Sequence, residues 1–321
     1  MNPTGESLIR TIRHGLIPAV PVPFRKDTTI HEQAQEQYVR YMAEQPIAGV
    51  AVWAHTGRGL HLTVSQREYI LKSWRAGIPD KPIIAGVGGD PHATKSKDFV
   101  ASARAMAQHA VECGADAFLV YAPTFFRPLD ISAQEKAIIE YHAALAEYGK
   151  PLIIFFLYEA AGGITYSDHI LRELLSLQSV AGIKIATLDS VMTFQNIAAI
   201  VSQNFPEKLL ITGEDRFFGY TLMCGAQAAL VGMGSACCQL QADMMKAYYE
   251  KHVSFIELSN KVDMLSFVTF DQPMEGYIER MLCVLAEQKV IPEDAVHDPW
   301  GPAVTEHEKE QISRVLPLLH H

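Results

Sequence analysis

Residues 181–186 read AGIKIA, a short apolar run with one lysine, Lys184, near its middle. A run of this length and composition is typical of a buried β-strand. Burying an ammonium group without a partner is costly, and burial lowers the pKa of a lysine until the neutral amine is accessible. A neutral amine can condense with a carbonyl group to form a Schiff base. Two interpretations of Lys184 follow: a catalytic amine, or a strand-end lysine whose head reaches solvent while its stem packs on apolar neighbours.

Apolar runs of the same kind recur along the chain, and a helix-like segment follows each of them. This alternation indicates parallel strands joined by helical crossovers. Between the runs, apolar residues recur at helical spacing over residues 101–113 and 133–148. The eight expected strands are Ile17–Val22, Gly49–Ala54, Pro82–Val87, Ala117–Tyr121, Leu152–Leu157, Gly182–Ala186, Leu209–Thr212 and Ala228–Gly232.

Two of the intervening segments open with helix-start signals. Thr63 with Gln66, and Ser132 with Glu135, have the spacing of a capping box. In a capping box the two side chains satisfy free backbone N–H groups at the first turn of a helix. We therefore expect a helix to begin at each of these positions.

Eight strand-helix units without a linker predict an α/β protein with a (β/α)8 TIM barrel over residues 1–252. Residues 253–321 are expected to form a helical region packed on the barrel. A doubly wound open sheet is the alternative, but it usually carries a glycine-rich phosphate-binding turn after its first strand. The run Gly86-x-Gly88-Gly89 is too irregular for that fingerprint.

Composition excludes several classes of function. The chain has 321 residues, is 49% hydrophobic and carries a net charge of −9 without a basic cluster, which argues against a nucleic-acid partner. No apolar stretch reaches the ~20 residues that span a bilayer, and the N-terminus lacks a secretory signal. The five cysteines lack C-x-x-C spacing, so we expect no metal site and a reducing, cytoplasmic location. His320 and His321 resemble the remnant of a tag and are left aside.

In a TIM barrel the catalytic groups gather where the strands end, and two expected strand ends carry turns suited to a substrate. The turn after the second strand, residues 54–59, offers backbone N–H groups and the Thr56 hydroxyl to an anion, although Thr56 could equally cap an ordinary loop. The turn after the fourth strand holds Phe125 and Phe126 between two prolines, where they would either wall a pocket or plug the barrel.

Two other strand ends carry ionisable side chains. Tyr158 and Glu159 follow the fifth strand and could transfer protons, although a loop glutamate is usually only solvated. Glu214 and Asp215 follow the seventh strand, where the favoured interpretation is the acidic start of a helix.

The order of these turns resembles that of the dihydrodipicolinate synthase and N-acetylneuraminate lyase family of class I aldolases, from about Gly15 to the C-terminal helices. The family's G-[ST]-T-G-E turn resembles residues 54–58, AHTGR, and its G-I-K motif resembles residues 182–187, GIKIAT. Its G-x-D turn resembles residues 213–215, and its glycine-rich eighth strand resembles residues 228–235. Together these motifs are specific to the superfamily but not to one substrate.

The resemblance implies a (β/α)8 barrel, commonly a homotetramer, that uses no metal or organic cofactor. Lys184 would condense with pyruvate or another 2-oxo acid, and the imine would serve as an electron sink for C–C or C–O cleavage. Thr56, with the N–H groups of Gly57 and its neighbours, would hold the substrate carboxylate. The other expected substrate-binding residues are Phe125, Phe155 and Leu230.

The sequence also departs from the family pattern. The catalytic tyrosine at the end of the fifth strand, counted from Pro151, is replaced by Phe155. His55 stands for the first hydroxyl residue of the Thr-Thr pair, and Phe125 for the second tyrosine of the fourth turn. The arginine that grips the second substrate's carboxylate in true synthases falls at Ala160. These departures argue against a synthase of lysine biosynthesis.

Two residues are candidates for the missing proton relay. Histidine has an ordinary pKa of ~6.5, and His55 lies beside the predicted carboxylate site, so it is suited to general acid-base catalysis. Tyr158 could instead reach in if the strand end bulges. We favour His55 because its position needs no bulge, although a histidine in a loop is often only hydrogen-bonded in place.

Three functions are compatible with this pattern. The first is a Schiff-base lyase that either cleaves a 2-oxo acid by a retro-aldol reaction or dehydrates a 2-keto-3-deoxy acid. A dihydrodipicolinate synthase with a rearranged proton relay is a variant of this enzymatic interpretation. The second is a non-catalytic barrel that binds or senses a 2-oxo acid through Lys184. The third is an unrelated barrel in which Lys184 is structural.

Overall fold

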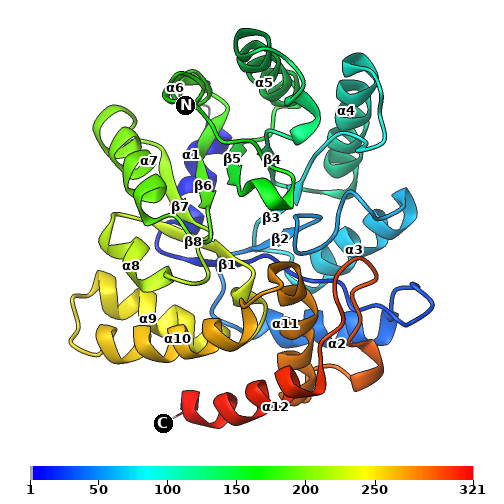
Figure 1. Ribbon diagram of the computed structural model, residues 1–321, viewed down its shortest axis with the longest axis vertical. Coiled ribbons are helices and arrows are strands. Elements are labelled where there is room, and N and C mark those ends of the chain that lie inside the picture. Colours follow the sequence, from blue (N-terminus) through cyan, green and yellow to red (C-terminus); the bar gives the residue numbers. More distant parts are fainter. Residues whose placement is uncertain (1–2, 321) are drawn as a thin grey trace.

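The computed structural model describes residues 3–320, which form an eight-stranded parallel barrel with the strand order β1-β8-β7-β6-β5-β4-β3-β2. A parallel bridge between Ala19 and Ala51 joins the ends of β1 and β2 and closes the ring. Helices surround the strands (Figure 1), so the predicted TIM barrel is confirmed. The strands are β1 Leu16–Pro18, β2 Val50–Val52, β3 Ile83–Gly86, β4 Ala117–Tyr121, β5 Leu152–Leu157, β6 Val180–Ala186, β7 Leu209–Thr212 and β8 Ala228–Val231.

Helices lie before, between and after the strands. Short 3-10 turns, η1 Thr124–Phe126, η2 Glu159–Ala161, η3 Met233–Ser235, η4 Met274–Gly276, η5 Glu293–Ala295 and η6 Leu316–His320, complete the described elements. The α-helices are α1 Pro3–Ile12, α2 Glu32–Ala43, α3 Val64–Gly77, α4 Ser96–Cys113, α5 Ile131–Ala146, α6 Asp168–Ser176, α7 Val191–Asn204, α8 Phe218–Met223, α9 Cys238–Tyr249, α10 Phe255–Thr269, α11 Tyr277–Glu287 and α12 Glu306–Val315.

The strand predictions hold best from the fourth strand onward. The bounds of β4, β5 and β7 are those predicted, and β6 begins two residues earlier than expected, at Val180. The first strand ends at Pro18, earlier than predicted; Ala19 and Val20 still donate to Val231 and Ala51, and Pro21 then has no N–H with which to continue the ladder. The second strand ends at Val52 because Trp53 adopts a left-handed φ of 57°.

The two helix-start predictions have opposite outcomes. Thr63 and Gln66 form the predicted capping box at the start of α3. The box predicted at Ser132 and Glu135 is wrong, because the N-cap of α5 is Asp130, two residues earlier, which accepts the N–H of Ala133. An ionised aspartate at the N-cap is a stronger acceptor than a serine hydroxyl would be.

Two apolar layers hold the barrel together. The outer layer lies between strands and helices, and the inner layer fills the barrel itself. Helix α1 contributes Leu8, Ile9 and Ile12 to the inner layer and so covers the end at which the strands begin. The inner layer contains Ile17, Ala51, Ile84, Leu119, Ile153, Phe155, Ile211 and Leu230 from the strands.

The helices after β8 gather on one side of the barrel (Figure 1). Helix α11 is buried from Tyr277 to Ala286, so it packs within the protein rather than on its surface. The 3-10 turn η4 immediately precedes it and lies near the carboxyl ends of the strands, because its Glu275 bonds to His55 after β2.

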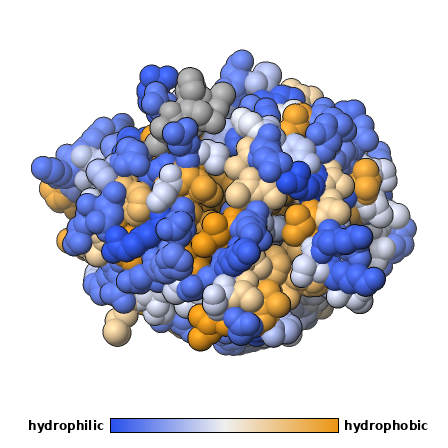
Figure 2. Space-filling view, turned by 90° about the horizontal axis from the view of Figure 1, so that it is seen from above, coloured by the Kyte–Doolittle hydropathy of each residue, from blue (hydrophilic) through white to orange (hydrophobic). Residues whose placement is uncertain are grey.

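The remaining surface is mostly polar. The face in Figure 2 shows hydrophilic side chains with smaller groups of apolar ones between them. Within residues 3–320 no helix is long and apolar enough to span a membrane.

Candidate active site

Lys184 lies on β6 with its side chain directed into the barrel, and it is only 5% exposed. Its Nζ atom is 4.0 Å from the ring centroid of Phe155, its register partner on β5. Gly213, at the end of β7, packs directly on its stem, where a Cβ would leave no room for Cε of the lysine. Among the described residues, none hydrogen-bonds the ammonium group. Lys184 is therefore a buried amine and not a strand-end lysine that reaches solvent.

Burial lowers the pKa of Lys184 to about 8, against the attraction of Asp215 and Glu214. Desolvation is the larger effect because the charged form loses its water without gaining a hydrogen bond. The neutral amine, which is the form that attacks a carbonyl group, is therefore far more populated at neutral pH than in an exposed lysine.

Glu214 and Asp215 are buried beneath the lysine. The prediction that they begin a helix is wrong, because α8 starts only at Phe218. Asp215 accepts the N–H of Met233 at 2.7 Å, and Glu214 accepts two N–H groups after β6, those of Thr187 and Leu188, each at 2.7 Å. Burial raises the pKa of both carboxyl groups to about 7, with hydrogen bonds opposing it. They tie the ends of β6 and β8 to the turn after β7.

The turn after β2 faces the lysine's end of the barrel. It is tightly wound: Trp53 and Arg58 have left-handed φ angles, and a Cβ on Gly59 would overlap the carbonyl of Trp53. Thr56 is buried, and its Oγ1 is 2.9 Å from Oη of Tyr277. The predicted carboxylate-binding threonine is thus bonded to a tyrosine from α11.

Glu275 is the centre of a hydrogen-bond network above this turn. Nε2 of His55 lies 3.0 Å from both of its carboxylate oxygens, and Nη1 of Arg58 donates at 2.9 Å. Tyr158 donates its hydroxyl at 2.7 Å. Burial opposes ionisation of Glu275, but hydrogen bonds and charges from His55, Tyr158 and Arg58 outweigh it and lower the pKa to about 2. Glu275 is therefore a carboxylate at all working pH values. Arg58 is further fixed by Asp298, which it contacts at 2.7 Å.

Both candidates for the proton relay meet at this carboxylate. The rings of His55 and Tyr158 lie 6.2 Å apart and nearly perpendicular. Tyr158 packs against the inner apolar layer without a bulge at its end of β5, since the register shift of that strand lies at Leu152 and Ile153. Burial, with Tyr277 and Glu275 nearby, raises the pKa of Tyr158.

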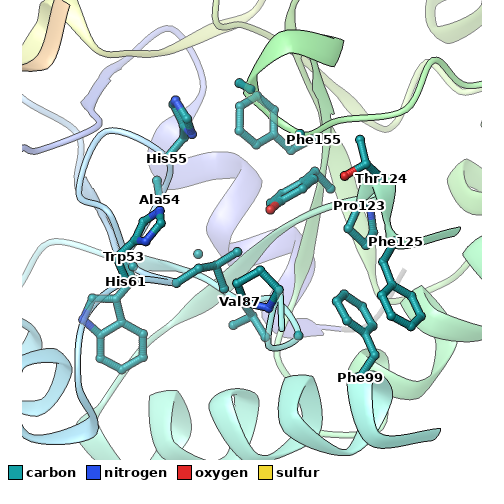
Figure 3. A pocket seen from close by; sticks show the side chains of 18 of the residues that line it. Trp53, Ala54, His55, His61, Val87, Phe99, Pro123, Thr124, Phe125 and Phe155 are labelled. Atoms are coloured by element: carbon teal, nitrogen blue, oxygen red, sulfur yellow. The ribbon is translucent and has the colours of Figure 1, made fainter. Parts of the chain in front are cut away.

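A cavity of about 640 Å³ opens beside these residues. His55 and Phe155 lie toward one end of it, and Phe99 and Phe125 lie together on another side (Figure 3). Phe125 stacks on Phe99 with ring centroids 4.4 Å apart. Phe125 therefore walls a pocket, as one of its two interpretations has it, while Phe126 is buried in the outer layer. Phe155 lines the cavity and also contacts Lys184, so the lysine lies at the edge of the cavity beside this ring.

The sequence profile of the Dihydrodipicolinate synthetase family matches residues 13–317. The chain belongs to that family. An uncharacterized DapA-like lyase of Thermococcus kodakarensis is 27% identical over 255 residues, which cover 79% of this chain and 82% of the relative. A 4-hydroxy-tetrahydrodipicolinate synthase of Methanothrix thermoacetophila is 21% identical over 240 residues, 75% of this chain and 76% of the relative.

Solved structures of the same fold include a prophage protein from Escherichia coli K12 that belongs to the dihydrodipicolinic acid synthase family, in complex with pyruvate. It superposes with a TM-score of 0.80 over 95% of this chain and 98% of that one, at 20% identity. A sialic acid aldolase of Ruminococcus gnavus gives a TM-score of 0.78 over 96% and 97%, at 19% identity. These likenesses bear on the fold.

The departures from the family pattern occupy distinct places in this dihydrodipicolinate synthetase family member. Phe155 lies against Lys184, and His55 lies at the same end of the cavity, bonded to Glu275. Ala160 is exposed on η2 and is not part of the cavity lining, although the next residue, Ala161, is. Glu159 is exposed and paired with Arg127. Leu230 is fully buried in the inner layer, beneath the cavity and outside its lining.

Several residues of the site were not found from the sequence. Glu275, Tyr277 and Asp298 come from the region after α10, and they contact residues 217 to 240 positions earlier in the chain. No local motif marks them, since η4 is a three-residue turn, Met274–Gly276. Their pairing with the β2 turn becomes visible only when the C-terminal region is folded onto the barrel.

Proposed function

We propose that the protein is a Schiff-base lyase that acts on pyruvate or a larger 2-oxo acid through an imine on Lys184. The observation that carries the proposal is the state of this lysine: it is buried at the carboxyl end of a barrel strand, unbonded among the described residues, and its pKa is lowered to about 8. Family membership and the lyase names of its relatives support the reaction class.

The imine forms by attack of the neutral amine on C2 of the 2-oxo acid with loss of one water. The N–H groups of Arg58 and Gly59 are bonded within the turn, to the carbonyl oxygens of His55 and Ala54. The Thr56 hydroxyl, which is buried at the barrel mouth, and the N–H groups of Thr56 and Gly57 are suited to the substrate carboxylate. Tyr277 would fix the Thr56 hydroxyl through their 2.9 Å contact. The imine itself draws electrons from the bond to be broken, so this chemistry requires no metal or organic cofactor.

We assign proton transfer to His55, with Glu275 as its positioning residue. Nε2 faces the carboxylate at 3.0 Å, which leaves Nδ1 to take and return the proton. Glu275 remains ionised because its pKa is held at about 2, so it also stabilises the imidazolium that forms. Tyr158 would hold Glu275 in place through its 2.7 Å hydrogen bond, which lets both relay candidates serve one network.

The reaction is either retro-aldol cleavage with release of pyruvate or dehydration of a 2-keto-3-deoxy acid. In each case His55 removes or returns a proton, and hydrolysis of the imine with one water regenerates Lys184. We further propose a homo-oligomer in the cytoplasm; the resemblance supports the assembly, and five free cysteines suit a reducing compartment.

The test is reduction with sodium borohydride in the presence of pyruvate, followed by intact mass measurement and a screen of 2-oxo acids for pyruvate release. We expect one pyruvyl group per chain and turnover of at least one substrate. A chain that stays unmodified, under conditions that label a known aldolase, would contradict the imine. Labelling without turnover of any 2-oxo acid would support a binding or sensing barrel instead.

A further inference from the structure

We infer that the group beyond C3 of the substrate is apolar, so that the natural substrate is a 4-hydroxy-2-oxo acid with an aryl group on C4. This inference rests on the proposed imine at Lys184 and names the substrate class for it. Its basis is the cavity beside the lysine. The distal carbons of a bound 2-oxo acid must lie in this cavity, so its walls and charged side chains determine which group on C4 is accepted.

The position of the cavity follows from Phe155. One side of this ring contacts Nζ of Lys184, with 4.0 Å to the centroid, and the ring also lines the cavity. The carboxylate end of a 2-oxo acid is directed to Thr56, on the turn whose other residues Ala54, His55, Arg58 and Gly59 line the cavity. With C1 and C2 held in this way, C3 and C4 must pass along Phe155 into the cavity.

The walls that receive C4 are apolar and aromatic. Phe99 and Phe125 are stacked nearly parallel, at 10° between their planes, and Phe125 is only partly buried, so one of its faces is open to a ligand. Tyr121 and Phe155 meet edge to face with centroids 6.3 Å apart. The other apolar lining residues are Trp53, Leu60, Val87, Leu119, Pro123 and Leu129.

The charged side chains at the cavity are already partnered. Arg58 is bonded to Glu275 and Asp298, and His55 to Glu275. His61 stacks on Trp300, and burial, with Arg58 nearby, lowers its pKa and so disfavours the charged form. Within residues 3–320 the lining thus holds no unpaired cation for a second carboxylate.

Hydroxyl-bearing lining residues are few for a sugar chain: Thr94, Ser96 and Thr124 besides Tyr121. A polyol chain would lose its water here without equivalent hydrogen bonds, and that loss is costly. An aryl ring has no hydroxyl groups whose hydrogen bonds to water would be lost, and it gains stacking on an aromatic wall. The volume of about 640 Å³ is within the range that encloses small organic ligands, roughly 300–1,000 Å³.

The reaction that follows is balanced without a redox partner. Lys184 forms the imine at C2 with loss of water, and Nδ1 of His55 takes the proton of the C4 hydroxyl. The C3–C4 bond breaks, its electron pair enters the enamine, and an aryl aldehyde leaves. The proton returns to C3, and water hydrolyses the imine to pyruvate and free Lys184.

The experiment compares pyruvate release from 4-hydroxy-4-phenyl-2-oxobutanoate and from 2-keto-3-deoxygluconate, with lactate dehydrogenase and NADH as the readout. We expect kcat/KM for the phenyl substrate to be about 30-fold higher or more, the ratio that corresponds to burying one aromatic ring. Equal values, a preference for the sugar acid, or turnover of neither substrate would overturn the inference. Borohydride trapping with pyruvate is measured in parallel, because its failure would overturn the imine proposal itself.

A pair of variants tests the wall directly. Phe125→Ala is expected to lower kcat/KM for the phenyl substrate about tenfold, mainly through KM, since the stacking face is lost. Phe267→Ala is the matched control, because Phe267 is an exposed phenylalanine on α10 outside the cavity. Trapping of pyruvate by the Phe125 variant would establish that it is folded. An unchanged KM in that folded variant would contradict the assignment of the aryl group to this wall.

Discussion

Two buried lysines lie at opposite ends of neighbouring barrel strands, Lys184 near the carboxyl end of β6 and Lys208 just before β7. They are 5% and 4% exposed, and burial lowers the pKa of both. Nζ of Lys208 donates to two carbonyl oxygens, those of Leu177 at 3.0 Å and Val180 at 2.7 Å, whereas Nζ of Lys184 lies on an aromatic face. Burial alone therefore does not make a catalytic amine; what matters is whether the buried nitrogen is already committed to a hydrogen bond.

The largest difference between the two lysines should be in activity. Lys184→Ala is expected to lower kcat by at least about 10³-fold, because no other amine can form the imine. Lys208→Ala should leave kcat and KM near their wild-type values. Steady-state kinetics with pyruvate release as the readout make the comparison, and comparable activity losses in both variants would contradict it.

For stability we expect the opposite order: replacing Lys208 should lower the free energy of unfolding more than replacing Lys184. Lys208→Ala removes two hydrogen bonds, those to the carbonyl oxygens of Leu177 and Val180, and we expect this to cost about 1–3 kcal/mol of unfolding free energy. Lys184→Met replaces an unbonded buried ammonium by an apolar side chain of similar length, so it should be neutral or stabilising. Urea unfolding at pH 7 measures both changes. A Lys184→Met variant that loses more stability than Lys208→Ala would show that the first lysine is the structural one.

Substitutions in the proposed proton relay should have the next largest effect on kcat. His55→Ala is expected to lower kcat about 10²- to 10⁴-fold while borohydride labelling by pyruvate is largely retained, since the imine forms without a C4 proton transfer. Tyr158→Phe removes one of the hydrogen bonds to Glu275 and should cost about tenfold or less. If His55→Ala turns over normally and Tyr158→Phe is inactive, the assignment of the relay is wrong.

Glu275→Gln tests the positioning of that histidine. The amide keeps the shape of the side chain but removes the charge that His55 and Arg58 face, so we expect kcat to fall about tenfold to 10²-fold with little change in KM. Asp298→Asn is the matched control, because it weakens the same arginine without touching His55. Equal kinetic effects in the two variants would mean that Glu275 acts only through Arg58.

The smallest expected effect is the pH dependence of stability. Burial lowers the pKa of Lys184 from 10.5 to about 8, so between these values the unfolded chain still binds a proton that the folded chain has released. Stability due to Lys184 therefore rises with pH over this window. Relative to Lys184→Met, the wild type should gain about 1 kcal/mol between pH 8 and pH 9.

Urea unfolding of both proteins at the two pH values measures this gain. In the wild type both points lie above the pKa of about 7 of Glu214 and Asp215. Loss of Lys184 removes an attraction that lowers the pKa of Asp215, so ionisation of Asp215 destabilises the variant as pH rises and widens the difference in the same direction. A constant difference between the two proteins would mean that Lys184 does not titrate in this range.

Local sequence was sufficient where one strand or turn carries the information. The rhythm of apolar runs predicted all eight strands, and Lys184 was found because a charge inside an apolar run is conspicuous. Thr63, with Gln66, correctly predicted the start of α3. Errors arose where the nearest pattern was misleading: Glu214 and Asp215 resemble a helix cap, but their oxygens bond to chain segments after β6 and β8.

The other half of the site could not be predicted in this way. Glu275 and Tyr277 act on residues about 220 positions earlier, and an isolated acid in a short turn carries no periodicity. Only the docking of α11 beside the barrel brings them to His55 and Thr56. The sequence thus identified the amine, and the three-dimensional structure supplied the partner of its proposed base.

The most direct test of the imine on Lys184 is a peptide map after borohydride reduction with pyruvate. Trypsin cuts unmodified chain after Arg172, Lys184 and Lys208, which gives peptides 173–184 and 185–208. A pyruvyl group on Lys184 blocks the middle cut, so we expect the joined peptide 173–208 with the added mass on Lys184 and a normal cut after Lys208. Two unmodified peptides, or the label on Lys208, would contradict the assignment of Lys184 as the catalytic amine.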